Sequence, residues 1–329
     1  MLEAARRLAP APVRTVTPLH GGGNSMVYGV ETTEGARYAL KRYPRNDTRG
    51  RRQLAESRAL RFMERQGLAY VPGLLAADLD SGYNLLSWLD GTVPGSLSAE
   101  DLRQFAEFQI ALDRAGGAGK EEKIGEASEA CLSGARILSH IDGRLARLQA
   151  LRGECQELDA FFDKGLTPAR RRFEEEARKV YDRLALSFDE DLPSEKQTLI
   201  VSDFGAHNAL RHPSGRLLFL DFEYFGWDDP LTSVANFVLH PGMRLSVSQK
   251  VFFRDCLLVH FGGDSAAERL TVLMPLFALR WGVIILGEFL PEKWTQRRRA
   301  GQAGNWNQAR RQQLAKAKRL LEPFLTAAS

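Results

Sequence analysis

The sequence predicts an α+β fold made of two lobes, with a β-rich N-terminal lobe and a larger, mostly helical C-terminal lobe. Up to Trp88, short segments rich in β-branched and aromatic residues alternate with glycine-containing turns, which is typical of strands. From Ser98 onward the apolar residues recur at helical spacing instead. Asp90-Gly91 and Pro94-Gly95 break the chain between these regions. We therefore expect residues 1–90 to form the first lobe and residues 91–329 to form the second.

The first lobe is expected to consist mainly of strands around one helix. A helical pattern covers Gln53–Gln66, and Glu34-Gly35 is typical of a tight hairpin turn. The predicted strands are Val13–Leu19, Met26–Thr32, Ala36–Tyr43, Val71–Leu79 and Tyr83–Trp88.

The second lobe is expected to be helical almost throughout. Ser98 followed by Asp101 is an N-cap signature, and Gly116–Lys123 is predicted to be a loop between helices. The charge run Arg170–Lys179 is typical of a solvated helix face with internal ion pairs. Strand character returns at Leu199–Val201 and Arg216–Leu220, and the chain after Pro230 is again helical.

Composition excludes some classes of protein. The chain has 329 residues, of which 44% are hydrophobic, so it can bury a substantial core. Its 45 Lys and Arg against 41 Asp and Glu leave a net charge of only +4, which gives little support to nucleic-acid binding. The 3 cysteines show neither a disulfide framework nor the spacing of zinc ligands.

Two segments could indicate export or a membrane span, and neither of them does. Residues Met1–Pro10 carry charges and lack the apolar core of a secretory signal. The segment Thr271–Leu290 is apolar but contains Arg280 and Glu288, which are costly inside a bilayer. We expect a buried helix there, and we expect a cytoplasmic protein.

A glycine-rich turn lies between the first two predicted strands. It reads Gly21-Gly22-Gly23-Asn24-Ser25, and glycines allow a backbone to approach a polyphosphate closely. Taken alone, such a run is more typical of an ordinary tight turn.

The third predicted strand carries Lys41. Strand alternation places it on the same face as Ala39 and opposite Leu40. A strand lysine that follows a glycine-rich turn could reach the phosphates of a nucleotide. Glu56 in the following helix is the preferred partner for this lysine, with Glu64 as the competing choice.

Two apolar strands each end at a carboxylate. After Leu199–Val201 comes Asp203, and Asn208 follows it by five positions. In phosphoryl transfer such an Asp aligns the acceptor hydroxyl and takes its proton, while the Asn ligates Mg²⁺. After Leu217–Leu220 comes Asp221, whose apolar surroundings favour a metal or cationic partner. Each motif alone is also compatible with a polar turn.

Together, the order of these motifs is that of a kinase-type site, and the sequence resembles the aminoglycoside phosphotransferase and choline kinase families of the protein-kinase-like fold. The resemblance implies that Asp203 is the catalytic base and that Asn208 and Asp221 bind Mg²⁺. It also implies that Lys41 binds the phosphates of ATP with Glu56 as its partner. One departure is Val201, which occupies the position of a usual histidine in the catalytic loop.

The resemblance also suggests where the rest of the ligands bind. The segment Leu86–Gly91 resembles the adenine-binding connection, where Ser87 and Leu89 would contact the base through their backbone. Acidic and aromatic residues after the metal Asp favour a cationic acceptor, which Glu223, Trp227 and Asp228 would contact. The alternative is that Asp228 caps the following helix and that the aromatic residues belong to the core, which we favour for Trp227 taken alone. The basic segment Lys293–Arg319 would instead favour an anionic acceptor, and the sequence leaves this conflict open.

The expected activity is therefore ATP- and Mg²⁺-dependent phosphorylation of a small-molecule hydroxyl. A sugar or amino sugar is the first candidate acceptor, a choline-like amino alcohol the second, and an aminoglycoside antibiotic the third. A catalytically inactive, nucleotide-binding kinase fold remains the alternative of a different class. We expect no nucleic-acid or membrane partner, and the sequence leaves the oligomeric state open.

Overall fold

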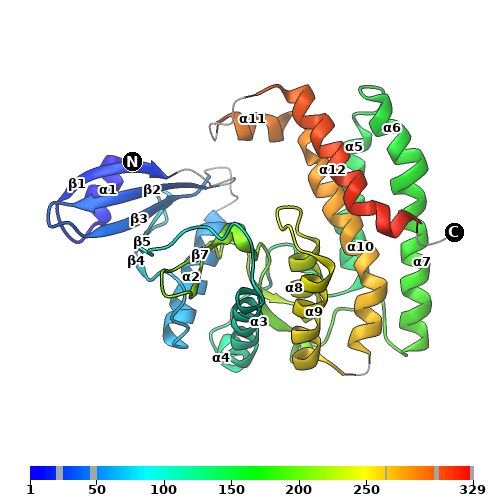
Figure 1. Ribbon diagram of the computed structural model, residues 1–329, viewed down its shortest axis with the longest axis horizontal. Helices are drawn as coiled ribbons and strands as arrows, with labels where there is room; N and C mark the ends of the chain where they lie inside the picture. Colours follow the sequence, from blue (N-terminus) through cyan, green and yellow to red (C-terminus); the bar gives the residue numbers. More distant parts are fainter. Residues whose placement is uncertain (20–24, 45–49, 264, 300–303, 327–329) are drawn as a thin grey trace. The chain divides into compact units, whose positions relative to one another are not determined.

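The computed structural model describes residues 1–19, 25–44, 50–263, 265–299 and 304–326 (Figure 1). The chain folds as two compact units. The first unit contains Met1–Ser128 and Leu199–Trp227, and the second contains Glu129–Thr198 and Asp228–Ser329.

An antiparallel five-stranded sheet dominates the N-terminal part of the first unit, in the order β1-β2-β3-β5-β4. Its strands are β1 (Val13–Leu19), β2 (Met26–Thr32), β3 (Arg37–Arg42), β4 (Leu74–Asp78) and β5 (Tyr83–Ser87). In the β2–β3 hairpin Val27 is opposite Lys41, and the turn between them contains Gly35 with φ of 84°. All five strands were predicted from the sequence, with ends that differ by up to three residues.

Two helices contact this sheet. Helix α1 (Leu2–Leu8), which was not predicted, packs Ala4 and Ala5 into a core with Leu40 of β3. Helix α2 (Arg51–Arg65) carries Gln53, whose side chain donates to the backbone oxygens of Asp78 and Tyr83. Since Leu40 is in the α1 core, strand alternation turns Lys41 to the other face, where it meets Glu56 of α2.

The first unit continues with α3 (Ala99–Arg114) and α4 (Gly116–Glu121). Ser98 and Asp101 form a reciprocal capping box at the start of α3, as predicted. The loop predicted at Gly116–Lys123 is wrong for its first six residues, which form α4. Only Ala115 separates α4 from α3, and the glycines of α4 lower its helix propensity, so the sequence does not predict this short helix.

Four short strands complete the first unit, apart from their end residues Thr198 and Asp228, which belong to the second. They are β6 (Thr198–Val201), β7 (Ala209–Arg211), β8 (Leu217–Phe219) and β9 (Phe225–Asp228). β7 and β8 form an antiparallel hairpin, and β6 pairs with β9. The backbone of Thr92 exchanges two hydrogen bonds with that of Arg211. Gly91 has φ of 158° there, and a Cβ at this position would lie 2.9 Å from the oxygen of Arg211, so the close approach requires glycine.

The second unit is helical, with α10 (Ala266–Leu286) at its centre. This helix contacts α5 (Gly134–Gln149), α7 (Thr167–Arg183), α8 (Pro230–Leu239) and α12 (Trp306–Thr326) (Figure 1). The remaining helices are α6 (Gln156–Phe161), a π-helical turn at Phe162–Leu166, α9 (Val247–Phe261) and α11 (Pro291–Arg299). Residues Ala266–Phe289 are long and apolar enough to cross a membrane, but 61% of their apolar window is buried inside the fold. Arg280 is also buried there against Glu129, so α10 is a core helix as expected.

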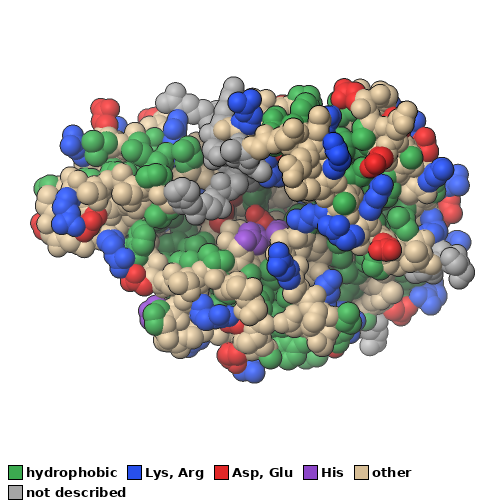
Figure 2. All heavy atoms as spheres, turned by 45° about the horizontal axis from the view of Figure 1, so that its top comes forward, with side chains coloured by type: hydrophobic (Ala, Val, Ile, Leu, Met, Phe, Trp, Pro, Cys, Tyr) green, Lys and Arg blue, Asp and Glu red, His purple; other side chains and the backbone are tan. Residues whose placement is uncertain are grey.

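The charge run in α7 forms the expected ion pairs along the helix. Arg170 pairs with Glu174, and Arg171 and Arg172 pair with Glu175 and Glu176 one turn further on. On the face drawn in Figure 2, the Lys and Arg side chains of the described residues are likewise interspersed with Asp and Glu.

The observed units do not coincide with the lobes expected from the sequence. Residues 91–128 and 199–227 join the N-terminal sheet in one unit, instead of following the boundary expected at residue 90. Hydrogen bonds distant in sequence account for this: the side chain of Gln109 donates to the oxygen of Leu199, and the backbone of Phe219 donates to that of Tyr70. The functional division into lobes at residue 90 stays a prediction.

Candidate functional site

A buried ion-pair cluster lies on the sheet face that meets α2. The ammonium nitrogen of Lys41 is 2.6 Å from Glu56 Oε2 and 2.8 Å from Asp221 Oδ1. A third carboxylate, that of Glu223, lies 3.8 Å from the same nitrogen. Strand β3, helix α2 and the segment after β8 each contribute to this cluster, and all of them belong to the first unit.

Glu56 is completely enclosed, with 1% of its side chain exposed, yet both of its oxygens have partners. Oε2 accepts from Lys41 and from the hydroxyl of Tyr43, and Oε1 accepts from the backbone N–H of Phe222. A buried carboxylate is stable only with such partners. Glu64, the competing choice, is exposed on the outer side of α2.

The electrostatics of Lys41 favour its charged form. Burial alone would lower the pKa of Lys41, but the attraction of Glu56, Asp221 and Glu223 outweighs it, and the pKa is raised. The ammonium group therefore stays charged at neutral pH and can hold a polyanion. Burial and the nearby carboxylate of Asp221 raise the pKa of Glu223.

Asp203 lies in the loop that follows β6, and its side chain is 31% exposed. Its Oδ1 is 3.0 Å from Nε2 of His207. The side-chain amide of Asn208 donates to the backbone oxygen of Asp203 at 2.8 Å, which closes the five-residue loop on itself. This hydrogen bond fixes the orientation of the Asn208 side-chain amide, including its oxygen. The carboxylate of Asp203 remains accessible to solvent.

Asn208 and Asp221 flank the same end of the β7–β8 hairpin, Asn208 just before β7 and Asp221 two positions after β8. Leu220 N–H donates to the backbone oxygen of Asn208 at 2.9 Å, one position before Asp221. Asp221 adopts a left-handed backbone conformation with φ of 65°, which is uncommon for a residue other than glycine. Its side chain is 31% exposed, so it can be reached from solvent although Lys41 is buried.

Buried phenylalanines fix the backbone on both sides of these acids. Phe204 directly follows Asp203, and Phe222 directly follows Asp221. Phe108 of α3 contacts both, with ring centroids 5.7 Å from Phe204 and 6.3 Å from Phe222. Phe219 of β8 lies 4.4 Å from the same ring. This aromatic cluster anchors both acid-bearing loops on α3.

Glu223 connects the cluster to the end of the glycine-rich turn. It accepts a hydrogen bond from the hydroxyl of Ser25 at 3.0 Å and pairs with Arg52 at 3.3 Å. The guanidinium of Arg52 also lies 5.2 Å from the centre of the Tyr224 ring. Ser25 and Lys41 thus share one carboxylate. Gly21, Gly22, Gly23 and Asn24, predicted to bind the nucleotide, lie outside the described residues.

The predicted adenine-binding residues lie at the end of β5. Ser87 pairs with Tyr38 of β3, and its hydroxyl accepts from the N–H of Gly73 at 2.8 Å. Leu89 follows in a half-buried irregular segment. Their role as adenine contacts stays a prediction.

The three residues expected to contact the acceptor are all buried. Glu223 is 1% exposed, Asp228 is not exposed at all, and Trp227 is 8% exposed. The Trp227 ring packs against Gly116 and Gly119 of α4, where a Cβ on either glycine would lie within 3.3 Å of it. Asp228 accepts from the N–H groups of Cys131 and Asp229, while Asp229 caps α8 by accepting from Leu231. This packing supports a structural role, and the acceptor contacts stay a prediction.

Sequence reasoning missed three residues of this site: Tyr43, Arg52 and His207. Tyr43 directly follows β3, two positions after Lys41, and in the predicted strand Ala36–Tyr43 alternation places both side chains on the same face. Its contact with Glu56 could therefore have been predicted from the spacing. His207 follows Asp203 by four positions, and that proximity was a weak signal. Arg52 meets Glu223 across 171 positions, and no local pattern indicates that pair.

Comparison with known families agrees with this arrangement. The model of the phosphotransferase enzyme family matches residues 15–249, which is well over half of the chain. The protein therefore belongs to this family. No curated protein sequence gives a significant match.

Solved structures show the same fold over nearly the whole chain. Choline kinase LicA from Streptococcus pneumoniae is 16% identical, with a TM-score of 0.59 over 98% of this chain and 97% of that one. Spectinomycin phosphotransferase, solved with ADP and spectinomycin, is 11% identical, with a TM-score of 0.60 over 98% and 95%. Macrolide 2'-phosphotransferase MphH from Brachybacterium faecium is 16% identical, with a TM-score of 0.56 over 100% and 98%. The expected fold and the resemblance to this family are confirmed.

Proposed function

We propose that this protein is an ATP- and Mg²⁺-dependent kinase that phosphorylates a hydroxyl group of a small molecule. The observation that carries this proposal is the buried cluster in which Lys41 contacts both Glu56 and Asp221. A charged lysine held by a helix carboxylate beside a solvent-accessible aspartate is the arrangement that kinase-type phosphoryl transfer requires. Two similar structures were solved with ADP or AMP, which supports a nucleotide as the donor.

Each residue of the site would have a separate role in the reaction. Lys41 would bind the α- and β-phosphates, and Glu56 would hold its ammonium group in place. Asp203 would accept the proton of the acceptor hydroxyl as its oxygen attacks the γ-phosphorus and the bond to ADP breaks. Asn208 and Asp221 offer the oxygen ligands that Mg²⁺ prefers. When bound there, the ion would neutralise charge on the phosphates.

The acceptor is proposed from the sequence and from the similar proteins. We place a sugar or amino sugar first and a choline-like amino alcohol second, with an aminoglycoside third. Proteins of similar structure include a choline kinase and phosphotransferases for spectinomycin and macrolides, which supports a small-molecule acceptor. We also place the protein in the cytoplasm, where ATP and Mg²⁺ are abundant.

The test measures ADP release from Mg²⁺-ATP against a panel of sugars, amino sugars, amino alcohols and aminoglycosides. The Asp203→Asn and Asp221→Asn variants are assayed beside the wild type, with Asp80→Asn as a matched control on an exposed residue of the same unit. We expect one acceptor class to stimulate ADP release and the Asp203 variant to reduce it by about 10²–10⁴-fold. Nucleotide binding without turnover for any acceptor would instead support the inactive kinase fold.

A further inference from the structure

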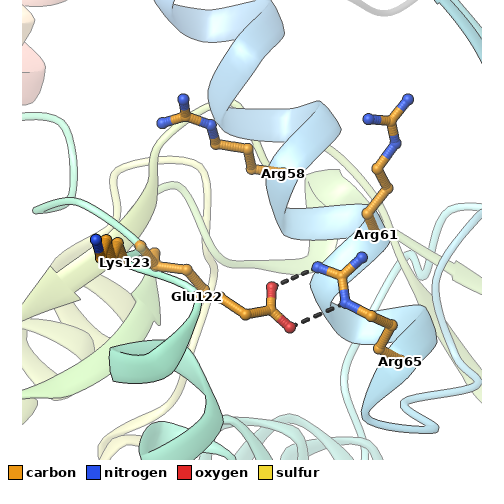
Figure 3. Close-up of a pocket in the computed structure, with 6 residues that line it drawn as sticks. Arg58, Arg61, Arg65, Glu122 and Lys123 are labelled. Atoms are coloured by element: carbon orange, nitrogen blue, oxygen red, sulfur yellow. Dashed lines mark hydrogen bonds and ion pairs between the residues drawn. The ribbon is translucent and has the colours of Figure 1, made fainter.

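A surface pocket lies between helix α2 and the segment that follows α4, within the first unit (Figure 3). Its volume is about 360 Å³, and pockets for small molecules span about 300–1,000 Å³. The lining residues are Arg58, Arg61, Arg65, Glu122, Lys123 and Ile124. The pocket can therefore hold a small ligand, and the nucleotide cluster around Lys41 contributes nothing to its lining.

The arginines of the pocket come from one side of α2. Positions 58, 61 and 65 are three and seven residues apart, so their side chains leave the helix within about 60° of one another. All three are exposed, whereas Glu56, Leu60 and Met63 are buried on the opposite side. Like charges at this spacing repel one another and destabilise a helix. The side of α2 that lines the pocket thus carries three positive charges that repel one another.

Only one acid opposes these charges in the lining. Four of the lining side chains are cationic and one, Glu122, is anionic. Glu122 is fully engaged with Arg65, whose Nε lies 2.9 Å from one carboxylate oxygen while Nη2 contacts the other (Figure 3). Among the described residues, Arg58, Arg61 and Lys123 form no ion pair.

Several other exposed arginines of this unit do have a carboxylate partner. Examples are Arg7 with Asp78, Arg14 with Glu31, Arg37 with Asp90 and Arg103 with Glu100. Lys123 also adopts a left-handed backbone conformation with φ of 52°, which is strained for a residue with a Cβ. Unpaired guanidinium groups around a hollow are suited to an oxyanion, because the planar fork matches two oxygens of a phosphate group.

We propose that this pocket is a binding site for a small soluble anion that carries a phosphate group, and that Arg58 and Arg61 are its main contacts. The site is separate from the nucleotide cluster. It lies on the outer side of the helix that holds Glu56 on its inner side. An anion bound here would offset the repulsion within α2, the helix that positions Lys41. The effect on the helix that positions Lys41 rests on the proposed function, whereas the binding of the anion in the pocket does not.

The test is calorimetric titration of the full chain with inorganic phosphate and with pyrophosphate, at constant ionic strength and with Mg²⁺-ADP present to fill the nucleotide site. The wild type is compared with the double variant Arg58→Ala/Arg61→Ala. The matched control is Arg6→Ala/Arg103→Ala, which removes the same charge from exposed helix positions of the same unit. We expect the pocket variant to bind at least about tenfold more weakly, since it loses the charge-assisted hydrogen bonds of two guanidinium groups. The control should bind like the wild type.

Two results would overturn the proposal: no binding of either anion by the wild type, or the same loss of affinity in both double variants. The second result would mean that the overall charge of the unit, and not the pocket, attracts the anion. A separate titration of the same proteins with Mg²⁺-ADP tests the nucleotide site. If Mg²⁺-ADP does not bind, the proposed function is contradicted. The phosphate titrations are then repeated without ADP, and comparison of the two double variants still tests the pocket.

Discussion

At the scale of single residues, Glu56 joins three parts of the first unit. One carboxylate oxygen accepts from Lys41 of β3 and from Tyr43 just after this strand, and the other accepts from the backbone N–H of Phe222. Lys41 is 4% exposed, so it depends on these carboxylates for its charge. Glu56 therefore connects the strand segment, the helix and the acid-bearing loop, and the direct contact of Lys41 with Asp221 adds a second connection between strand and loop.

Replacing Glu56 with alanine should destabilise the first unit strongly. We expect the free energy of unfolding to fall by about 3–5 kcal/mol, as is typical when one partner of a buried ion pair is removed. The measurement is urea denaturation of the full chain. Glu64→Ala is the matched control on the exposed side of the same helix and should change stability by no more than about 0.5 kcal/mol. Equal losses in the two variants would contradict the assigned pairing.

Asp221 allows a test of backbone strain. Its φ of 65° disfavours any residue with a Cβ, and glycine adopts this conformation without strain. We expect Asp221→Gly to be more stable than Asp221→Ala by about 1 kcal/mol, although glycine is usually the less stable choice because it raises the entropy of the unfolded chain. Both variants lose the same carboxylate, so their difference in urea denaturation isolates the backbone. Greater stability of the alanine variant would refute the left-handed conformation.

At the scale of elements, the capping box of α3 connects this helix to β7. Ser98 and Asp101 satisfy each other's backbone N–H groups, and the buried Asp101 also accepts from Arg211 at 2.6 Å. The start of α3 is thereby tied to the strand that follows Asn208. Further along α3, Phe108 packs against Phe204 and Phe222.

Ser98→Ala should therefore weaken the start of α3. Loss of an N-cap side chain typically costs about 1 kcal/mol, and we expect a decrease of that size in the free energy of unfolding. Ser98→Thr retains the hydroxyl and should recover most of the loss. Thermal and urea denaturation of the three proteins compare these effects. A threonine variant as unstable as the alanine variant would indicate that packing, and not the cap, holds this end of the helix.

The elements that position the site were largely predictable because they depend on local patterns. Strand alternation placed Lys41 on the side away from Leu40, and apolar runs followed by an acid located Asp203 and Asp221. The short helix α4 was missed because its glycines resemble a loop, and α1 because seven residues carry too little periodicity. The Arg52–Glu223 pair was missed because its residues meet only after the chain has folded.

At the scale of the whole molecule, the two compact units depend on contacts between segments far apart in the sequence. Residues 199–227 return to the first unit after a long helical segment that belongs to the second. The predicted chain break at Asp90-Gly91 lies outside helices and strands. Glycine is needed at position 91 because the backbone there passes close to that of Arg211. Which segments share a core depends on contacts between distant residues, and those have no local signature.

The second unit contains a buried acid that should make the stability of the molecule depend on pH. Asp228 is not exposed, and burial raises its pKa to about 8, with the nearby charge of Asp229 adding to the increase. Its Oδ1 accepts from the N–H groups of Cys131 and Asp229, both at 2.7 Å. Hydrogen bonds from these backbone groups and the charge of Arg280 favour the ionised form, but they do not offset the cost of burial.

Between the unfolded pKa of 3.8 and the folded value of about 8, the folded chain holds a proton on Asp228 that the unfolded chain has released. The free energy of unfolding should therefore fall as the pH rises through this window, by up to about 1.4 kcal/mol per pH unit, and this contribution should level off above it. Asp228→Asn keeps the acceptor oxygen and cannot ionise, so its stability relative to wild type should increase steadily with pH. Urea denaturation at several pH values between about 5 and 9 measures both profiles, with Asp80→Asn as the exposed control that retains the wild-type slope. Parallel profiles for Asp228→Asn and wild type would show that Asp228 is already ionised in the folded protein, and its unpartnered Oδ2 would then need a cation that the described residues do not supply.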